Sequence, residues 1–123
     1  MTFQQAVEAT ASVQAHYRRG LKALPDDHAG RIRCDKPRRL TGSVNVDAAL
    51  RAAEPNAPRW DYGIGFRRKN AEHAIWVEVH PASSTSVTDM LAKLQWLRNW
   101  LREQAPALAA LPQNDYYWVC LLY

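Results

Sequence analysis

Cysteine is scarce in this chain, because only Cys34 and Cys120 occur among 123 residues. Two cysteines cannot build a disulfide framework, and their spacing matches no metal-binding motif. The sequence also lacks a run of the ~20 apolar residues needed to cross a bilayer, and it lacks a basic and then apolar leader at its start. We therefore expect free thiols, no membrane partner and a reducing location, with the cytoplasm as the default.

Core-forming residues are plentiful, since 47% of the chain is hydrophobic and five residues are tryptophan. That composition is typical of a folded globular protein rather than a disordered one. A length of 123 residues fits a single domain, which we expect to span residues 1–123. The net charge of +4 favours anionic partners only weakly.

Hydrophobic periodicity predicts an α/β (α+β) domain. The expected elements are, in order, a helix over 3–24, a strand over 40–46, a short helix over 48–54 capped by Asp47, two hairpin strands over 59–66 and 74–80, a helix over 87–104 and a strand over 116–122. The last run is almost continuously apolar, which predicts a strand that is covered on both faces and parallel to the strand before its helix. The main order is α-β-β-β-α-β, a four-stranded mixed sheet flanked by helices.

The hairpin carries one acidic residue on each strand. If the chain turns at Lys69-Asn70, facing residues have numbers that sum to 139, as Asp61 and Glu78 do. Directly opposed residues have Cβ atoms ~5 Å apart and share a face. Two carboxylates that close repel each other unless a positive charge lies between them, and a divalent cation is a common solution. We expect either a metal site or a pair neutralised by an arginine such as Arg59.

Alternation also sorts the hairpin into two faces. The face expected to turn toward a core carries Trp60, Tyr62, Ile64, Phe66, Ile75, Val77 and Val79. The other, more polar face carries Asp61, Gly63, Gly65, Trp76, Glu78 and His80. Trp76 falls opposite Gly63, so we expect its ring to cover the gap that the glycine leaves.

The acidic pair and the order of elements resemble the PD-(D/E)XK nuclease superfamily, whose fold is also called restriction-endonuclease-like. That family has an α-β-β-β-α-β core, with an Asp on the second core strand and an acidic-X-Lys triplet on the third. Asp61, the 17-residue step to Glu78 and the triplet Glu78-Val79-His80 match this layout. The resemblance implies that Asp61 and Glu78 bind Mg²⁺ or Mn²⁺, with the Val79 carbonyl as a further ligand, to polarise the scissile phosphate and activate a water.

The departure from the family pattern is His80, which stands where the family has lysine. A histidine can act as a base near neutral pH or bind a softer metal such as Mn²⁺ or Zn²⁺, and it can equally be a structural residue that bonds a loop carbonyl. Lys93, on the next helix, is the alternative source of the cation, because some members of the superfamily relocate their lysine. Otherwise Lys93 is an ordinary solvated helix residue.

Basic side chains form two groups that could contact nucleic acid. They are Arg31, Arg33, Lys36, Arg38 and Arg39 in an irregular segment, and Arg67, Arg68 and Lys69 at the hairpin tip. Each group alone is most simply a solvated loop or turn. They become candidates for binding DNA or RNA if the fold places both on the side that bears Asp61 and Glu78.

Three functional classes follow from these patterns. The first is a metal-dependent nuclease acting on phosphodiester bonds of DNA or RNA, with His80 or Lys93 assisting the attacking water. The second is a catalytically inactive nuclease-fold protein that binds nucleic acid. The third is an interaction module that forms a homodimer or meets another protein through Trp96, Trp100 or the C-terminal strand. The two tryptophans lie one helical turn apart, and a place in the core is an equally good expectation for them.

Overall fold

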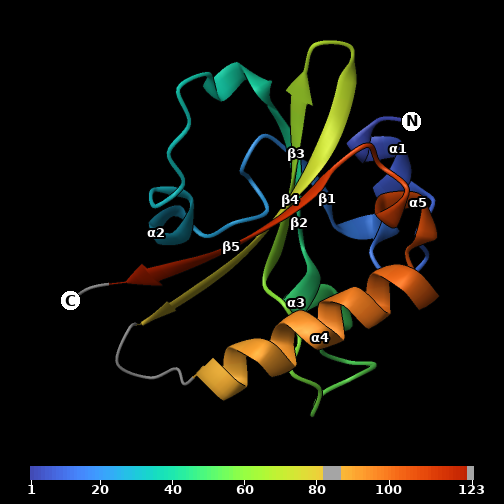
Figure 1. Ribbon diagram of the computed structural model, residues 1–123, viewed down its shortest axis with the longest axis vertical. Coiled ribbons are helices and arrows are strands. Elements are labelled where there is room, and N and C mark those ends of the chain that lie inside the picture. The colour runs from blue at the N-terminus through green and yellow to red at the C-terminus, as the bar shows by residue number, and fades with distance from the viewer. Residues whose placement is uncertain (82–86, 122–123) are drawn as a thin grey trace.

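The computed structural model describes residues 1–81 and 87–121. It is an α+β structure, with a five-stranded mixed sheet flanked by helices (Figure 1). The strands are β1 (Tyr17–Arg19), β2 (Leu40–Asn45), β3 (Tyr62–Arg68), β4 (Ala71–Pro81) and β5 (Asn114–Leu121). The helices are α1 (Phe3–Glu8), α2 (Asp26–Ala29), α3 (Val46–Leu50), α4 (Val87–Glu103) and α5 (Pro106–Ala109), with 3-10 turns η1 (Gln14–His16) and η2 (Pro37–Arg39). None of the helices in these described ranges is long and apolar enough to span a membrane.

The strands lie side by side in sequence order, β1-β2-β3-β4-β5. Neighbours are antiparallel except β4 and β5, which are parallel and are joined through α4. In the β3–β4 hairpin, Tyr62 pairs with Val77 and Arg68 pairs with Ala71. Both pairs sum to 139, so the predicted register is confirmed, as is the predicted parallel pairing of the last two strands.

The sheet has five strands rather than the predicted four, because the segment expected to form one helix over 3–24 breaks into several pieces. Helix α1 ends at Glu8, and β1 follows after η1. Val13 and Leu24 do have helical spacing, but they pack in two different hydrophobic clusters. One straight helix could not reach both clusters. Gly20, with a φ of 54°, redirects the chain directly after β1.

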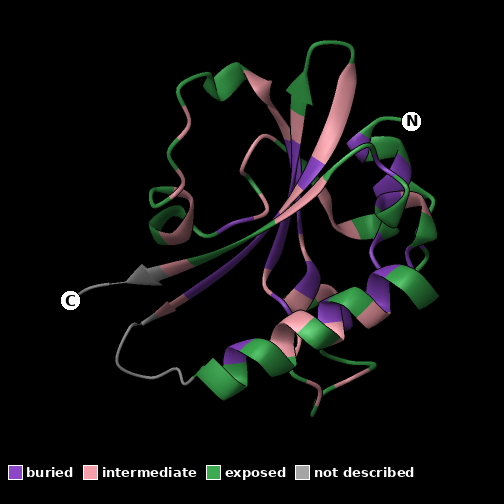
Figure 2. Ribbon diagram, in the orientation of Figure 1, coloured by how far each residue is buried: buried purple, intermediate pink, exposed green. Residues whose placement is uncertain are grey.

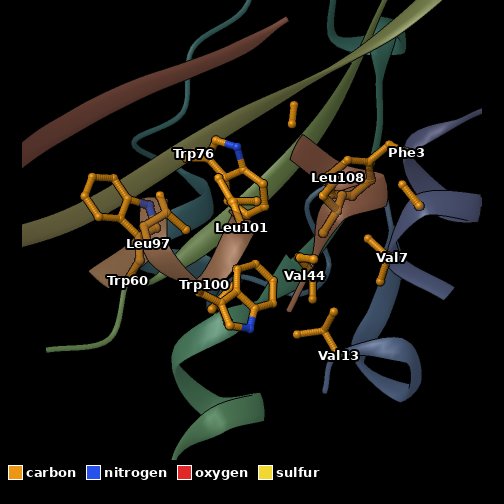
Figure 3. Close-up of a cluster of buried hydrophobic side chains, with 14 of the residues drawn as sticks. Phe3, Val7, Val13, Val44, Trp60, Trp76, Leu97, Trp100, Leu101 and Leu108 are labelled. Atoms are coloured by element: carbon orange, nitrogen blue, oxygen red, sulfur yellow. The ribbon is translucent and has the colours of Figure 1, made fainter. Parts of the chain in front are cut away.

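Hydrophobic clusters cover both faces of the sheet. The larger lies between the sheet and helices α1, α4 and α5, and Figure 3 shows its members Phe3, Val7, Val13, Val44, Trp60, Trp76, Leu97, Trp100, Leu101 and Leu108. The smaller lies on the side of α2 and contains Leu24, Tyr62, Ile64, Val77 and Val79. Burial is concentrated in the middle of the central strands (Figure 2). The hairpin face predicted to be more polar therefore carries the main core.

Three local predictions need correction. Trp60 belongs to the same hydrophobic cluster as Trp76 rather than to that of Tyr62, because it precedes β3 and the alternation of that strand does not extend back to it. The short helix is capped by the Asn45 side chain, which accepts from the Ala48 N–H, and not by Asp47. The C-terminal strand is not covered on both faces, because it lies at the edge of the sheet with exposed aromatic side chains.

Trp76 covers the gap at Gly63, as predicted. A Cβ atom placed at Gly63 would lie 2.5 Å from Cζ3 of Trp76. We expect Gly63→Ala to lower the free energy of unfolding by about 1–3 kcal/mol, because the buried indole has no room to move away. Urea denaturation would measure the loss, with Gly30→Ala as a control at an exposed glycine. Equal stability of the two variants would contradict the packing described here.

Candidate functional site

The two predicted carboxylates lie together at one end of the hairpin. Asp61 directly precedes β3, and Glu78 lies in β4. The Asp61 N–H donates to Oε1 of Glu78 at 3.0 Å, and the Val79 N–H donates to Oδ2 of Asp61 at 3.0 Å. Each carboxylate is therefore held by the backbone of the opposite strand, which fixes both side chains in one place. Val79 takes part through its N–H, a contact that no sequence pattern indicated.

Lys93 and His80 complete the site around Glu78. Nζ of Lys93, in the second turn of α4, lies 2.7 Å from Oε2 of Glu78, and Nε2 of His80 lies 2.6 Å from the same oxygen. The Lys93 and His80 nitrogens are 3.4 Å apart. The cation beside the acidic pair is therefore Lys93. The suggestion of Arg59 was wrong, because its Nε bonds Oδ1 of Asp47 at 2.9 Å instead.

Burial controls the charge states in this group. Glu78 is 0% exposed, and burial followed by the nearby Asp61 charge raises its pKa to about 8, although Lys93 opposes the shift. Burial and then the Lys93 charge lower the pKa of His80, although Asp61 and Asp89 oppose this. His80 is thus favoured as a neutral imidazole near pH 7, while Glu78 retains a proton more readily than an ordinary glutamate. The cluster can hold and exchange a proton in the range where most enzymes work.

The side chains of this site offer few ligands to a hard cation such as Mg²⁺. In residues 1–81 and 87–121, no group of three or more His, Cys, Asp or Glu side chains is arranged to hold a metal ion. Mg²⁺, however, is often bound by one or two carboxylates together with waters and substrate phosphates. Asp61 and Glu78 fit that pattern, provided that the half-buried Lys93 moves off Oε2.

No protein-family model, curated protein or solved structure matches the chain.

The basic groups lie away from this site. Arg67, Arg68 and Lys69 are at the tip of the hairpin, the end opposite to Asp61 and ~20 Å away along the strands. Arg38 and Arg39 belong to η2, directly before the start of β2, which pairs with the tip half of β3. The loop containing Arg31, Arg33 and Lys36 runs on the α2 side of the sheet, whereas α4 and Lys93 lie on the other side (Figure 1). The two basic groups therefore do not share the side of the sheet that bears Asp61 and Glu78, as a nucleic-acid surface around the acidic pair would require.

Trp96 and Trp100 belong to the core. Their rings stack with an interplanar angle of 8° and a centroid distance of 6.1 Å. Trp100 is buried and donates to Oγ of Ser12, and Trp96 is half-buried and donates to Oε1 of Glu54. Of the surfaces predicted for a protein partner, the C-terminal strand is the one with exposed aromatic side chains in the part of the chain that the structure describes.

Proposed function

We propose that the protein is a metal-dependent phosphodiesterase of the nuclease type, acting on DNA or RNA, and a divergent member of the PD-(D/E)XK superfamily. The observation that carries this proposal is the convergence of four side chains from three elements. Asp61 precedes β3, Glu78 and His80 lie in β4, and Lys93 comes from α4. Two carboxylates with a lysine and a neutral imidazole are the groups that phosphodiester hydrolysis uses.

The topology supports the same proposal. Strands β2, β3 and β4 form an antiparallel meander, and α4 then leads to the parallel β5. If β1 and the short helices α2, α3 and α5 are counted as additions, the remaining order α1-β2-β3-β4-α4-β5 is similar to the α-β-β-β-α-β order of the superfamily core. Asp61 directly precedes the second strand of this order and Glu78 lies in the third, a placement similar to the family pattern. Lys93, on α4, would take the part of the lysine whose place in the triplet is occupied by His80.

Each side chain has a role that its surroundings favour. Asp61 and Glu78 would hold the divalent cation, which supplies charge neutralisation at the phosphoryl oxygens and lowers the pKa of a bound water. Lys93 places a positive charge where negative charge develops on the phosphate. His80, with a lowered pKa, is free of its proton near pH 7 and can accept one from the attacking water. Glu78 must lose its proton to act as a ligand, so we expect cation affinity to rise with pH.

A Mn²⁺ titration followed by amide NMR signals tests the proposed site without any assumption about the substrate. We expect selective paramagnetic broadening around Asp61, Glu78 and His80. Asp61→Asn keeps an oxygen that can accept from the Val79 N–H but removes the charge, so the broadening should disappear. Asp26→Asn is the matched control, because Asp26 is exposed on α2, on the other side of the sheet.

Cleavage of circular single-stranded DNA, plasmid DNA and structured RNA in the presence of Mg²⁺ or Mn²⁺ tests the activity itself. Lys93→Met should lower the cleavage rate by about 10²-fold or more, because a positive charge beside the reacting phosphate is lost. Asp61→Asn should abolish cleavage while circular dichroism shows an intact fold. Cleavage that survives in Asp61→Asn would contradict the proposed mechanism.

A second candidate is supported by one specific observation. Glu78 is fully buried, and its Oε2 already contacts both Lys93 and His80, so the cluster is satisfied without a metal ion. Such a cluster suits an inactive nuclease-fold protein, which would bind nucleic acid through basic groups away from this site or would bind another protein. An absence of selective broadening at millimolar Mn²⁺ would favour this candidate over the enzyme.

A further inference from the structure

The two edges of the sheet differ in how they are protected. β1 forms one edge with only three residues, two of which are the exposed Arg18 and Arg19. β5 forms the other edge with eight residues, no lysine, arginine or proline, and an unshifted register against β4. Short length, charge and bulges are the usual means of preventing an edge from pairing with another chain. β1 is short and carries two charges, whereas β5 is long, has no register shift and carries the single charge of Asp115.

Exposed apolar side chains gather beside this unprotected edge. Among the residues that the structure describes, the large hydrophobic side chains that remain exposed are Val87, Leu91, Tyr116, Tyr117, Trp118 and Met1. All except Met1 lie on β5 or on the first turns of α4. Figure 2 shows exposed positions along β5, although the central strands beside it are buried. A contiguous patch of this kind is typical of a protein interface.

Apolar hollows flank β5 on both faces of the sheet. On the α2 side, a hollow of about 420 Å³ is lined by Ile75, Val77, Tyr117 and Val119, among others. On the α4 side, a hollow of about 250 Å³ is lined by residues that include Leu91 and Trp118. A single extended peptide could form backbone hydrogen bonds with the edge of β5. It would have no helices or loops of its own to cover the hollows on both faces of the sheet. A folded sheet with helices on its faces would bring them.

We propose that β5 is the interface of a symmetric dimer, in which two copies of the chain pair antiparallel through this strand. The edge is self-complementary, as a two-fold interface requires. With the axis at Tyr117, Tyr116 faces Trp118 of the second copy, and Asp115 faces Val119 of the second copy. Asp115 is the one charged residue from Asn114 to Val119, so no like charges are opposed. A two-fold axis normal to the sheet keeps both α4 helices on the same face, where their exposed Val87 and Leu91 side chains cover each other's hollows.

Light scattering coupled to size-exclusion chromatography tests this dimer over a wide range of protein concentration. The wild type should show twice the 14.0 kDa mass of one chain. Tyr117→Lys should raise the dimer dissociation constant at least about tenfold, because it places two positive charges at the two-fold axis. Tyr117 is 55% exposed, so this change should leave the fold intact by circular dichroism. Ala52→Lys, which adds the same charge at an exposed position outside β5 and α4, should leave the dimer unchanged.

A wild type that remains monomeric at every concentration would overturn the inference and leave the edge to a strand from a different protein. A dimer that Tyr117→Lys does not weaken, in a folded variant, would overturn it as well. Neither result bears on the phosphodiesterase proposal, which rests on Asp61, Glu78 and Lys93 and is tested by Mn²⁺.

Discussion

Trp76→Ala is expected to lower the free energy of unfolding by about 3–5 kcal/mol. The Trp76 side chain is fully buried between the sheet and α4, and its ring meets that of Trp100 edge-on at 6.1 Å. Its Nε1–H also donates to Oδ1 of Asn114 at 2.8 Å, which ties β4 to the start of β5. Small domains have a total stability of about 5–15 kcal/mol, so this change removes a large share of it.

Urea denaturation monitored by circular dichroism measures this loss, and Trp76→Phe separates its two causes. Phenylalanine keeps much of the buried volume but cannot donate to Asn114, so we expect a smaller loss of about 1–2 kcal/mol. An alanine variant within about 1 kcal/mol of the wild type would show that the indole is not the centre of the larger cluster.

Glu78→Gln is expected to flatten the dependence of stability on pH. The pKa of Glu78 rises from 4.5 in the unfolded chain to about 8 in the folded protein. Between these values the folded state binds more protons than the unfolded state, so the contribution of Glu78 to stability is present below pH 4.5 and is lost as the pH rises through 8. The whole loss amounts to about 3–5 kcal/mol, and glutamine, which does not titrate, should not show it.

His80 opposes this trend at lower pH, so the range of the measurement matters. Its pKa is lowered from 6.5, and its contribution is lost as the pH falls below that value. Urea midpoints measured in chelator between pH 6.5 and 9 therefore report mainly on Glu78, and the part of its loss that falls in this range is about 2 kcal/mol. Glu103→Gln, at an exposed position, should follow the wild type. Parallel curves for wild type and Glu78→Gln would show that the Glu78 carboxyl is not protonated by its burial.

The parts of the site that could be predicted from the sequence are the local ones. The register that opposes Asp61 and Glu78 follows from the position of the turn and from period-2 alternation, and both are properties of a short stretch of chain. Lys93 was expected as an alternative cation only through resemblance, and its contact with Glu78 needs α4 to pack against the sheet. No sequence pattern could decide between Lys93 and Arg59, because that choice depends on packing between distant segments.

The failures in the fold have a similar origin. Val13 and Leu24 repeat at helical intervals, but the spacing does not reveal that they pack on different faces of a sheet. The apolar run at the C-terminus predicts a strand correctly. Whether that strand lies in the middle or at the edge depends on how many strands the whole chain makes and where each docks. An edge strand that seals a dimer has the same composition as a covered central strand.

The hydrogen bonds that hold Asp61 and Glu78 join residues of one hairpin, so we expect this part of the site to form early in folding. Their contact closes when the hairpin forms, across 17 residues, whereas Lys93 reaches Glu78 only after α4 has docked. Two carboxyl groups thus meet before their cation arrives, a situation that favours a protonated Glu78 in the early hairpin. We then expect docking of α4 to bring the positive charge of Lys93 to Glu78 and to close the core over Trp76. Formation of the contact between Lys93 and Glu78 should therefore report that α4 has reached its native place.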